Sequence, residues 1–321
     1  MDTSRLACQL IRALRGRRSQ VALSHRLGYR SNVLYSWESG QGFPSAAKFF
    51  RLALLVGRTP NEALQRFLPH PDLAGQVDLT TKAGVAAVLR DLWGRRPLAT
   101  LADALGRDRF AVSRWLHGKT EPPLPEFLAL FEAATLALVD FLATLVDPAE
   151  LPEVAELWRA LQAARRSAYE LPWSHAVLRA VDLESYAALT EHRPGWIASR
   201  LGLTVNEEQR CLDLLCATGD LTWDGKRYRA TKSLTVDTGR DPAATRHLAA
   251  FWMQQGAERV REAGPGNFAF NVFGVSRADY ARLRELQRSY FAELRSIIAR
   301  SESTECVAVA TFQLFPLIDE D

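Results

Sequence analysis

The stretch LGYRSNVLYSWESGQGFP, from Leu27 to Pro44, decides the fold of the first part of this chain. A glycine follows the apolar end of one predicted helix, and a short second helix carries Leu34 and Trp37 three residues apart, on one face. Two short helices that cross steeply need a turn residue that tolerates positive φ, and Gly28 meets this need. Ser24 is the small residue expected where the two helices approach each other. The stretch therefore predicts a pair of helices joined by a tight turn.

The residues on either side extend this pattern. An apolar stripe at Leu6, Leu10, Ile11 and Leu14 predicts a preceding helix, and two further helices are expected over residues 45–57 and 59–68. The second helix of the pair ends in the pattern E-x-G-x-x-x-P, formed by Glu38, Gly40 and Pro44. From Ser4 to Leu68 the chain thus resembles the helix-turn-helix domain of phage-repressor-like (XRE-type) transcription regulators.

This resemblance implies which residues would contact duplex DNA. In the family, a glutamine that begins the first helix of the pair binds a phosphate, and Gln20 has that position. Base edges in the major groove would be read by residues at and near the start of the second helix. These candidates are Arg30, Ser31, Asn32, Tyr35 and Ser36. The alternative is that they form the solvated face of a small bundle.

The same pattern recurs 78 residues later, in LGRDRFAVSRWLHGKTEPP from Leu105. Gly106, Val112, Trp115, Gly118 and Pro122 take the positions of Gly28, Leu34, Trp37, Gly40 and Pro44. An internal repeat of this length predicts two tandem five-helix units.

The second unit departs from the family pattern, because Leu98 replaces the phosphate-binding glutamine and Leu116 replaces the glutamate. Asp108 is a plausible N-cap of its second helix. Phe110 would either meet a thymine methyl group or pack within the protein. The further DNA-contact candidates are Arg107, Arg109, Ser113, Arg114 and Lys119. The alternative is a degenerate repeat kept for packing or dimerisation.

The back half begins with a polar connecting helix over residues 148–171. Three helices and a hairpin around Asp224-Gly225 then predict a winged-helix-like domain over residues 172–240. Its third helix begins with acidic residues, which would repel phosphate, whereas its wing is basic through Lys226, Arg227, Arg229 and Lys232. We expect a module that contacts protein, with a phosphate contact by the wing as the alternative.

The last part predicts helices over residues 242–263 and 277–300, and strands over residues 268–275 and 306–314. These elements suggest a small α/β domain over residues 241–321, completed by a partner's strands if a second copy binds. From Leu171 to Ile318, ending in Q-x-F-P-L, the chain resembles a family of bacterial regulators whose C-terminal domain has no assigned function. That resemblance implies no site residues.

Charge is distributed unevenly along the chain. Residues 1–122 hold 19 Lys or Arg against 9 Asp or Glu, and residues 123–321 hold 21 against 28. A basic front joined to an acidic back is expected when only the front meets a polyanion. We found no catalytic motif, no zinc-ligand spacing among the four cysteines and six histidines, and no apolar run long enough for a membrane.

The predicted fold is therefore mainly α: helix-turn-helix domains over residues 1–70 and 78–147, the connecting helix, the winged-helix-like domain and the small α/β domain. The predicted function is that of a bacterial cytoplasmic transcription regulator, expected to be a repressor, that binds double-stranded DNA as a homodimer without enzymatic activity, metal or cofactor. Dimerisation would use the apolar helices after Pro125 or the back half, where an unknown small molecule or protein effector could also bind. The alternative is a protein-interaction adaptor or antitoxin-like regulator with only weak, non-specific DNA binding.

Overall fold

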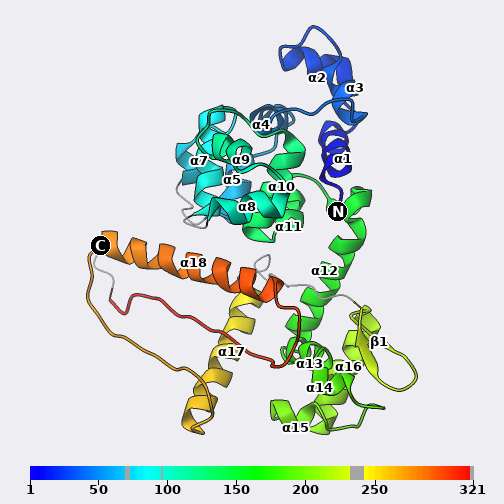
Figure 1. Cartoon of the computed structure of the whole chain (residues 1–321), viewed down its shortest axis with the longest axis vertical. Coiled ribbons are helices and arrows are strands. Elements are labelled where there is room, and N and C mark those ends of the chain that lie inside the picture. The colour runs from blue at the N-terminus through cyan, green and yellow to red at the C-terminus, as the bar shows by residue number, and fades with distance from the viewer. Residues whose placement is uncertain (69–72, 95–96, 232–241, 319–321) are drawn as a thin grey trace. The chain divides into compact units, whose positions relative to one another are not determined.

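The computed structural model describes residues 1–68, 73–94, 97–231 and 242–318 (Figure 1). Helices dominate these residues, which confirms the predicted mainly α fold. The chain divides into two units, of which the first contains Met1–Trp158 with Arg288–Glu293 and the second contains the remainder. The predicted domain limits at residues 70, 240, 241 and 321 lie outside the described residues.

The first unit contains two sets of five helices in the same order. The first set is α1 (Thr3–Arg15), α2 (Gln20–Arg26), α3 (Val33–Glu38), α4 (Ala46–Leu55) and α5 (Pro60–Gln65). After the short α6 (Leu73–Gln76), the second set is α7 (Lys82–Trp93), α8 (Leu98–Leu105), α9 (Arg109–Leu116), α10 (Leu124–Thr135) and α11 (Leu138–Leu145). The two turns match as well, because Gly28 and Gly106 have φ angles of +89° and +58°.

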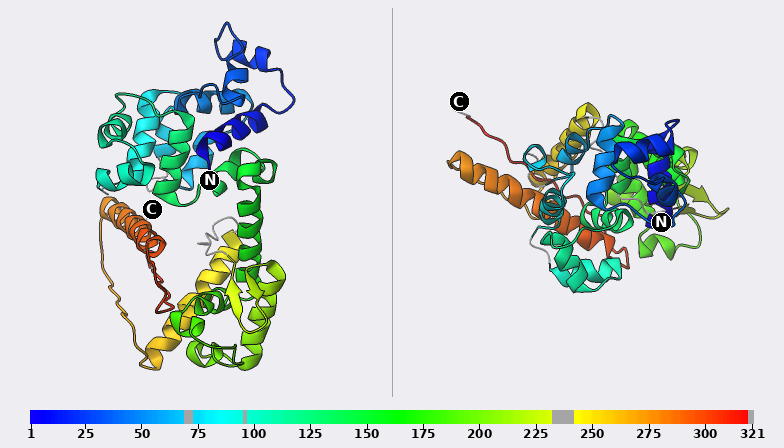
Figure 2. Two further views of the ribbon diagram at one scale, coloured as in Figure 1. Left: turned by 45° about the vertical axis from the view of Figure 1, so that its right-hand side comes forward. Right: turned by 90° about the horizontal axis from the view of Figure 1, so that it is seen from above.

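The two repeats share one hydrophobic core. Helices α4, α7 and α10 of the two repeats lie side by side (Figure 1, Figure 2). The ring centroids of Phe50 and Phe127 lie 5.2 Å apart, and those of Phe67 and Phe131 lie 5.4 Å apart, so that aromatic side chains of both repeats interlock. Leu128 and Phe131 on α10 are fully buried in this core. The expectation that the apolar helices after Pro125 mediate dimerisation is therefore wrong for α10, because its apolar face is already covered.

The second unit has a smaller core, formed by helices and a hairpin. A one-turn 3-10 helix η1 (Pro148–Glu150) and the long helix α12 (Pro152–Glu170) lead into it. The elements that follow are α13 (Ser174–Val181), α14 (Glu184–Ala187), α15 (Ala198–Leu201), α16 (Val205–Thr218), β1 (Leu221–Trp223) and β2 (Tyr228–Ala230). The two strands are antiparallel and pair Leu221 with Ala230 and Trp223 with Tyr228, which confirms the predicted hairpin.

Beyond residue 241 the structure corrects the sequence prediction. The helices are present as α17 (Pro242–Arg261) and α18 (Arg277–Ala299), but residues 268–275 and 306–314 are not strands. A strand needs a hydrogen-bonded neighbour, and neither segment pairs with any part of the chain that the structure describes. Phe270 and Val272 are 93% and 76% exposed, so the alternating apolar pattern is not packed within the chain. The described residues 242–318 of one chain therefore do not form the small α/β domain predicted for residues 241–321, and its completion by a partner's strands stays a prediction.

Candidate nucleic-acid interface

The short helix α3 has one buried face and one exposed face. Leu34 and Trp37 are 0% and 4% exposed, which confirms their predicted place in the core. Arg30, Ser31 and Tyr35 lie on the exposed side of the turn and helix. A helix with so few apolar residues is held in place because its buried side chains pack against α1 and α2, which leaves its polar face accessible.

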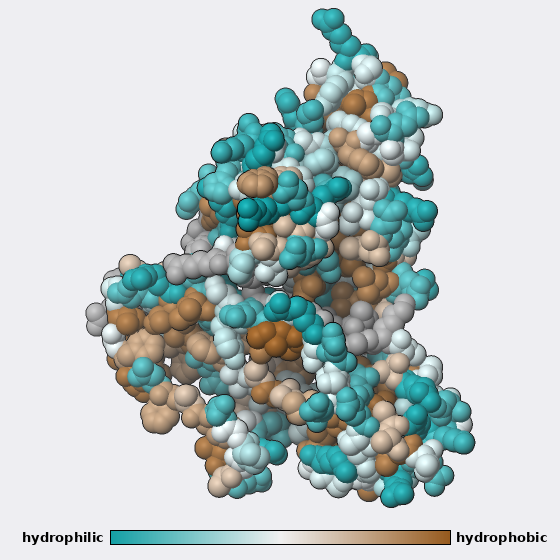
Figure 3. Space-filling view, viewed as in Figure 1, coloured by the Kyte–Doolittle hydropathy of each residue, from teal (hydrophilic) through white to brown (hydrophobic). Residues whose placement is uncertain are grey.

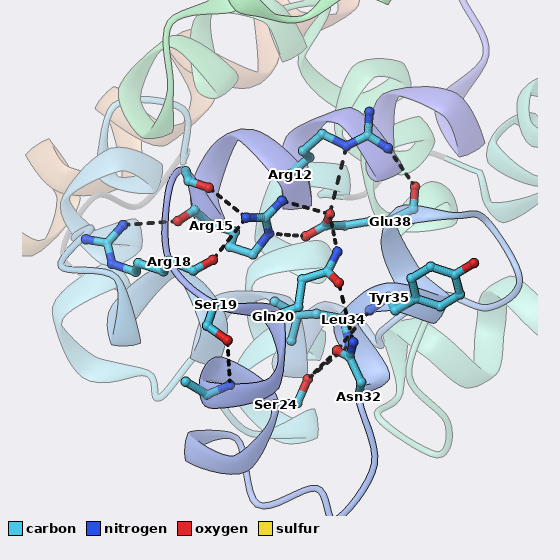
Figure 4. Close-up of polar contacts among 12 residues, drawn as sticks. Arg12, Arg15, Arg18, Ser19, Gln20, Ser24, Asn32, Leu34, Tyr35 and Glu38 are labelled. Carbon is cyan, nitrogen blue, oxygen red and sulfur yellow. Dashed lines mark hydrogen bonds and ion pairs between the residues drawn. The ribbon is translucent and has the colours of Figure 1, made fainter.

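A chain of polar contacts links α1, α2 and α3 beneath this face (Figure 4). The Glu38 carboxylate is buried and accepts two hydrogen bonds from Arg15, from Nε at 2.6 Å and from Nη2 at 3.1 Å. Gln20 Nε2 donates to the same carboxylate at 2.7 Å, and Asn32 Nδ2 donates to Gln20 Oε1 at 3.4 Å. The hydrogen bond to Glu38 raises the pKa of Arg15, so the Arg15 guanidinium keeps its positive charge.

Two of the predicted DNA contacts belong to this chain of bonds. Asn32 is the N-cap of α3, where its Oδ1 accepts from the backbone N–H of Tyr35 at 3.4 Å, and it is half-buried. Ser24 Oγ donates to Asn32 Oδ1 and also accepts from the backbone N–H of Leu34. Both polar ends of the Gln20 amide are engaged, with Glu38 and with Asn32. These side chains would have to exchange a bond with the protein for one with DNA.

The equivalent helix of the second repeat, α9, presents a more basic and more apolar surface. Asp108 caps it as predicted, because its Oδ1 accepts from the backbone N–H of Phe110 at 2.9 Å. Val112 and Trp115 are buried, while Arg109, Phe110 and Arg114 are exposed. The Arg109 guanidinium lies 5.0 Å from the centroid of the Phe110 ring, and Phe110 is 64% exposed.

The other predicted DNA-contact residues of the second repeat differ in whether their side chains already bind another residue of the chain. Arg107 pairs with Glu126, and this hydrogen bond raises the pKa of Arg107. Ser113 Oγ lies 3.3 Å from His117 Nδ1 on the same helix face. Lys119 is exposed just beyond α9. Arg107 would therefore have to leave a carboxylate to bind a phosphate.

A comparison of the two repeats shows a coordinated replacement that inspection of single positions missed. The first repeat has Arg15, Gln20 and Glu38 in mutual hydrogen-bond contact. At the positions 78 residues later the second repeat has Trp93, Leu98 and Leu116, and neither Trp93 nor Leu116 is more than 9% exposed. Polar pairing in one repeat is thus replaced as a set by apolar packing in the other. Aligning all positions of the repeats, instead of the turn alone, would have found this set.

The comparisons with known proteins concern the second half of the chain. A family model described as a domain of unknown function, DUF4423, matches residues 153–317, which is more than half of the chain. The chain belongs to the DUF4423 family. Neither the search of curated proteins nor the search of solved structures returned a match. The matched residues do not include the two repeats, so the helix-turn-helix interpretation rests on their sequence and geometry.

Within the DUF4423 region, the acidic start of α16 has a structural role. The Glu207 side chain forms a capping box with Thr204. The buried Glu208 carboxylate accepts backbone N–H groups of Gly195 at 2.7 Å and Ala198 at 3.2 Å. Because these carboxylates satisfy backbone donors, they fix the turn before α16.

The Glu208 carboxylate also faces a buried histidine. His192 Nε2 lies 4.0 Å from Glu208 Oε1, and His192 Nδ1 lies 3.1 Å from the Tyr186 hydroxyl. Burial lowers the pKa of His192 despite the opposing effect of Glu208, and burial raises the pKa of Tyr186 to about 12. Both groups are therefore neutral near pH 7, as expected for a packed polar cluster in the core.

The wing of the DUF4423 region uses part of its positive charge internally. Arg227 donates to the backbone carbonyl groups of Ala187 and Leu189, and Arg229 Nε donates to Asp224 at 2.5 Å. The backbone N–H of Arg227, the Arg229 side chain and the backbone N–H of Lys226 donate to Asp224 and hold its pKa well below its usual range. Lys232, also predicted to lie on the wing, is outside the described residues.

The described residues contain no group of three His, Cys, Asp or Glu side chains placed to hold a metal ion. Among them there is also no helix with the length and apolar character needed to cross a membrane.

Proposed function

We propose that this chain is a sequence-specific double-stranded-DNA-binding transcription regulator that inserts α3 and α9 into the major groove. The observation that carries the proposal is the division of both helices into a buried apolar face and an exposed polar face. Leu34 and Trp37 anchor α3, and Val112 and Trp115 anchor α9. The basic charge of residues 1–122 supplies the attraction to phosphates.

The exposed side chains suit different kinds of contact with DNA. Arg30 lies in the turn just before α3 and Arg109 is the first residue of α9, where an arginine can form paired hydrogen bonds with guanine. The exposed Phe110 can contact a thymine methyl group. Arg114 and Lys119 would bind phosphates directly. Gln20 would bind a phosphate only after its hydrogen bond to Glu38 breaks, and Arg107 only after its bond to Glu126 breaks. We further propose that the regulator is a repressor that acts in the bacterial cytoplasm.

A second copy of the chain is the proposed partner, and residues 242–318 are the proposed contact. Most of the exposed large apolar side chains of the described chain lie here, including Phe270, Val272, Phe315 and Leu317 (Figure 3). The segments that carry them, residues 267–276 and 306–317, contain no charged residue. Unpaired, uncharged segments of this kind aggregate unless covered. A second copy of the chain is a partner that is always present wherever the chain itself is made, which favours it as the partner that covers these segments.

The test uses Asn32, with a matched control at the same position. Asn32→Ala removes both the N-cap and the amide that could read adenine, whereas Asn32→Ser keeps a capping oxygen. If Asn32 reads a base, both variants relax preference at one base pair by about 1–3 kcal/mol. Loss of an arginine or lysine that contacts phosphate lowers the slope of log affinity against log salt by about one unit. Selection from random duplexes followed by salt titration measures both.

The alternative function, an adaptor or antitoxin-like regulator with weak DNA binding, is favoured by the same apolar surface of residues 242–318. It predicts a protein partner in fixed stoichiometry and DNA affinity that does not depend on sequence. Selection that returns no preferred sequence at moderate salt would support this alternative and rule out the proposed function.

A further inference from the structure

The two repeats are joined by a short antiparallel bridge between equivalent positions. Ser45 pairs with Pro123, 78 residues later, which is the spacing of the repeat. The backbone N–H of Ala46 donates to the Pro122 carbonyl at 3.0 Å, and the N–H of Leu124 donates to the Pro44 carbonyl at 2.8 Å. Exchanging the two repeats converts each of these hydrogen bonds into the other. The bridge is therefore symmetric.

The packing of the helices follows the same symmetry in part; α8 packs on α10, whereas α2 makes no contact of similar extent with α4. Helix α1 packs on α10, α10 on α4, and α4 on α7, while α5 packs on α11 (Figure 1). Exchange of α1 with α7, α4 with α10, and α5 with α11 leaves this set of contacts unchanged. A pair of like units that use the same surface on each other is related by a two-fold axis. Here that axis is approximate and passes through the Ser45–Pro123 bridge.

We infer that one chain presents two recognition helices to one duplex, so that a single chain reads two inverted half-sites. The exchange that relates the repeats also relates α3 to α9, because α3 packs on α1 as α9 packs on α7. Two helix-turn-helix units related in this way match DNA whose half-sites have inverted orientation. This inference rests on the proposed function.

The two half-sites must differ in sequence, because the scaffold is repeated but the exposed side chains are not. At the spacing of 78 residues, Asn32 corresponds to Phe110 and Tyr35 corresponds to Ser113. Arg30 corresponds to Asp108. A homodimer of single-repeat chains reads the same half-site twice. This chain, by contrast, reads two different sequences in a fixed order.

The spacing between the half-sites must also be fixed. The rings of Phe67, Phe131 and Phe141 connect the repeats, with centroids 5.4 Å apart for Phe67 and Phe131 and 4.6 Å apart for Phe131 and Phe141. Helices that share a close-packed core cannot slide apart to follow a change in DNA length. Two units on a flexible tether would tolerate such a change.

The experiment selects binding sites from random duplexes with the full chain and with two variants, Arg30→Ala and Arg109→Ala. We expect one bipartite site with two different motifs, and a stoichiometric titration that gives one chain per site, so that the proposed dimer binds two sites. Each variant should relax only one of the two motifs. Insertion of five or of ten base pairs between the motifs should each lower affinity at least tenfold.

Other outcomes separate this inference from the proposed function. Selection of one motif, or of the same motif twice, with Arg109→Ala unchanged, overturns the inference and leaves DNA reading by α3 intact. Undiminished affinity after both insertions also overturns it, because the repeats would then bind independently. A selection that finds no preferred sequence with any form of the protein overturns the proposed function itself.

Discussion

At the scale of single residues, the two repeats stabilise equivalent positions in two different ways, one with polar side chains and the other with apolar ones. In the first repeat, the buried Glu38 carboxylate accepts hydrogen bonds from the charged Arg15 and from the neutral amide of Gln20. In the second, apolar side chains at the corresponding positions fill the space. A buried ion pair gives little net stability over an apolar set of similar size, but loss of one partner is costly.

Glu38→Ala should therefore destabilise the first unit by about 2 kcal/mol, because it leaves the donors of Arg15 and Gln20 without their acceptor. Urea unfolding measures the change. The control is the triple variant Arg15→Trp/Gln20→Leu/Glu38→Leu, which copies Trp93, Leu98 and Leu116 of the second repeat. It should recover most of the loss, and a triple variant less stable than Glu38→Ala would contradict this account.

A second prediction concerns His175, on α13 of the second unit. Burial, with a smaller effect of Arg179, lowers the pKa of His175 to about 4. The unfolded chain binds this proton near pH 6.5, so the stabilising effect is complete above that pH and is lost as pH falls toward 4. The second unit should lose about 2 kcal/mol between pH 7.5 and pH 5.

Hydrogen exchange of the α13 amides at both pH values, corrected for intrinsic exchange rates, measures this loss. The variant His175→Gln should reduce the difference, with the remainder coming from His192, whose pKa burial also lowers. An unchanged pH dependence in His175→Gln would exclude His175 as the cause.

At the scale of elements, local sequence predicted the helices and turns well, for a physical reason. The positive-φ glycines, the apolar spacing on α3 and α9, and the Asp224-Gly225 turn are signals contained within a few residues. Residues 268–275 also have a clear local signal, an alternation typical of a strand. A strand exists only when a second segment pairs with it, and local sequence does not tell whether that segment is present.

The candidate site was predicted in part, for a similar reason. The exposed positions of Arg30, Tyr35 and Arg109 follow from helical spacing alone. The internal bonds of Gln20 and Asn32 depend on Glu38, which lies on another helix from Gln20. Such contacts cannot be read from spacing within one element.

The turn between α8 and α9 gives a prediction at this scale. Gly106 has φ +58° and ψ +35°, and a Cβ atom placed there would meet open space. Gly106→Ala should therefore cost about 1–2 kcal/mol from backbone strain alone. Gly106→Asn should cost less, because asparagine tolerates the left-handed region. Thermal unfolding of the two variants, compared with the unchanged protein, measures the difference, and equal losses would point to a steric cause.

At the scale of the whole molecule, residues 242–318 contrast with the rest of the chain. Leu248 on α17 is buried, yet Phe268, Phe270, Val272 and Phe312 are exposed. A stable interface between two proteins covers about 800 Å² on each partner. The exposed large apolar side chains of residues 242–318 are the basis of the proposed dimer.

The full chain should therefore sediment as a dimer, and Phe270→Glu/Val272→Glu should sediment as a monomer. The matched control is Phe110→Glu, which places a charge on another exposed aromatic residue, in the first unit, and should leave the mass unchanged. Analytical ultracentrifugation at several concentrations makes the comparison. A monomeric unchanged chain would refute the dimer without bearing on DNA binding.

The interleaved packing of the first unit has a consequence for synthesis on the ribosome. The buried side chains of α1, such as Leu6 and Leu10, pack against α10, which begins more than a hundred residues later. The first repeat cannot complete its core while it emerges from the exit tunnel, because half of that core is still untranslated. The apolar face of α1 therefore stays accessible to chaperones until α10 has been synthesised as far as Phe131. The two repeats then complete their folding together.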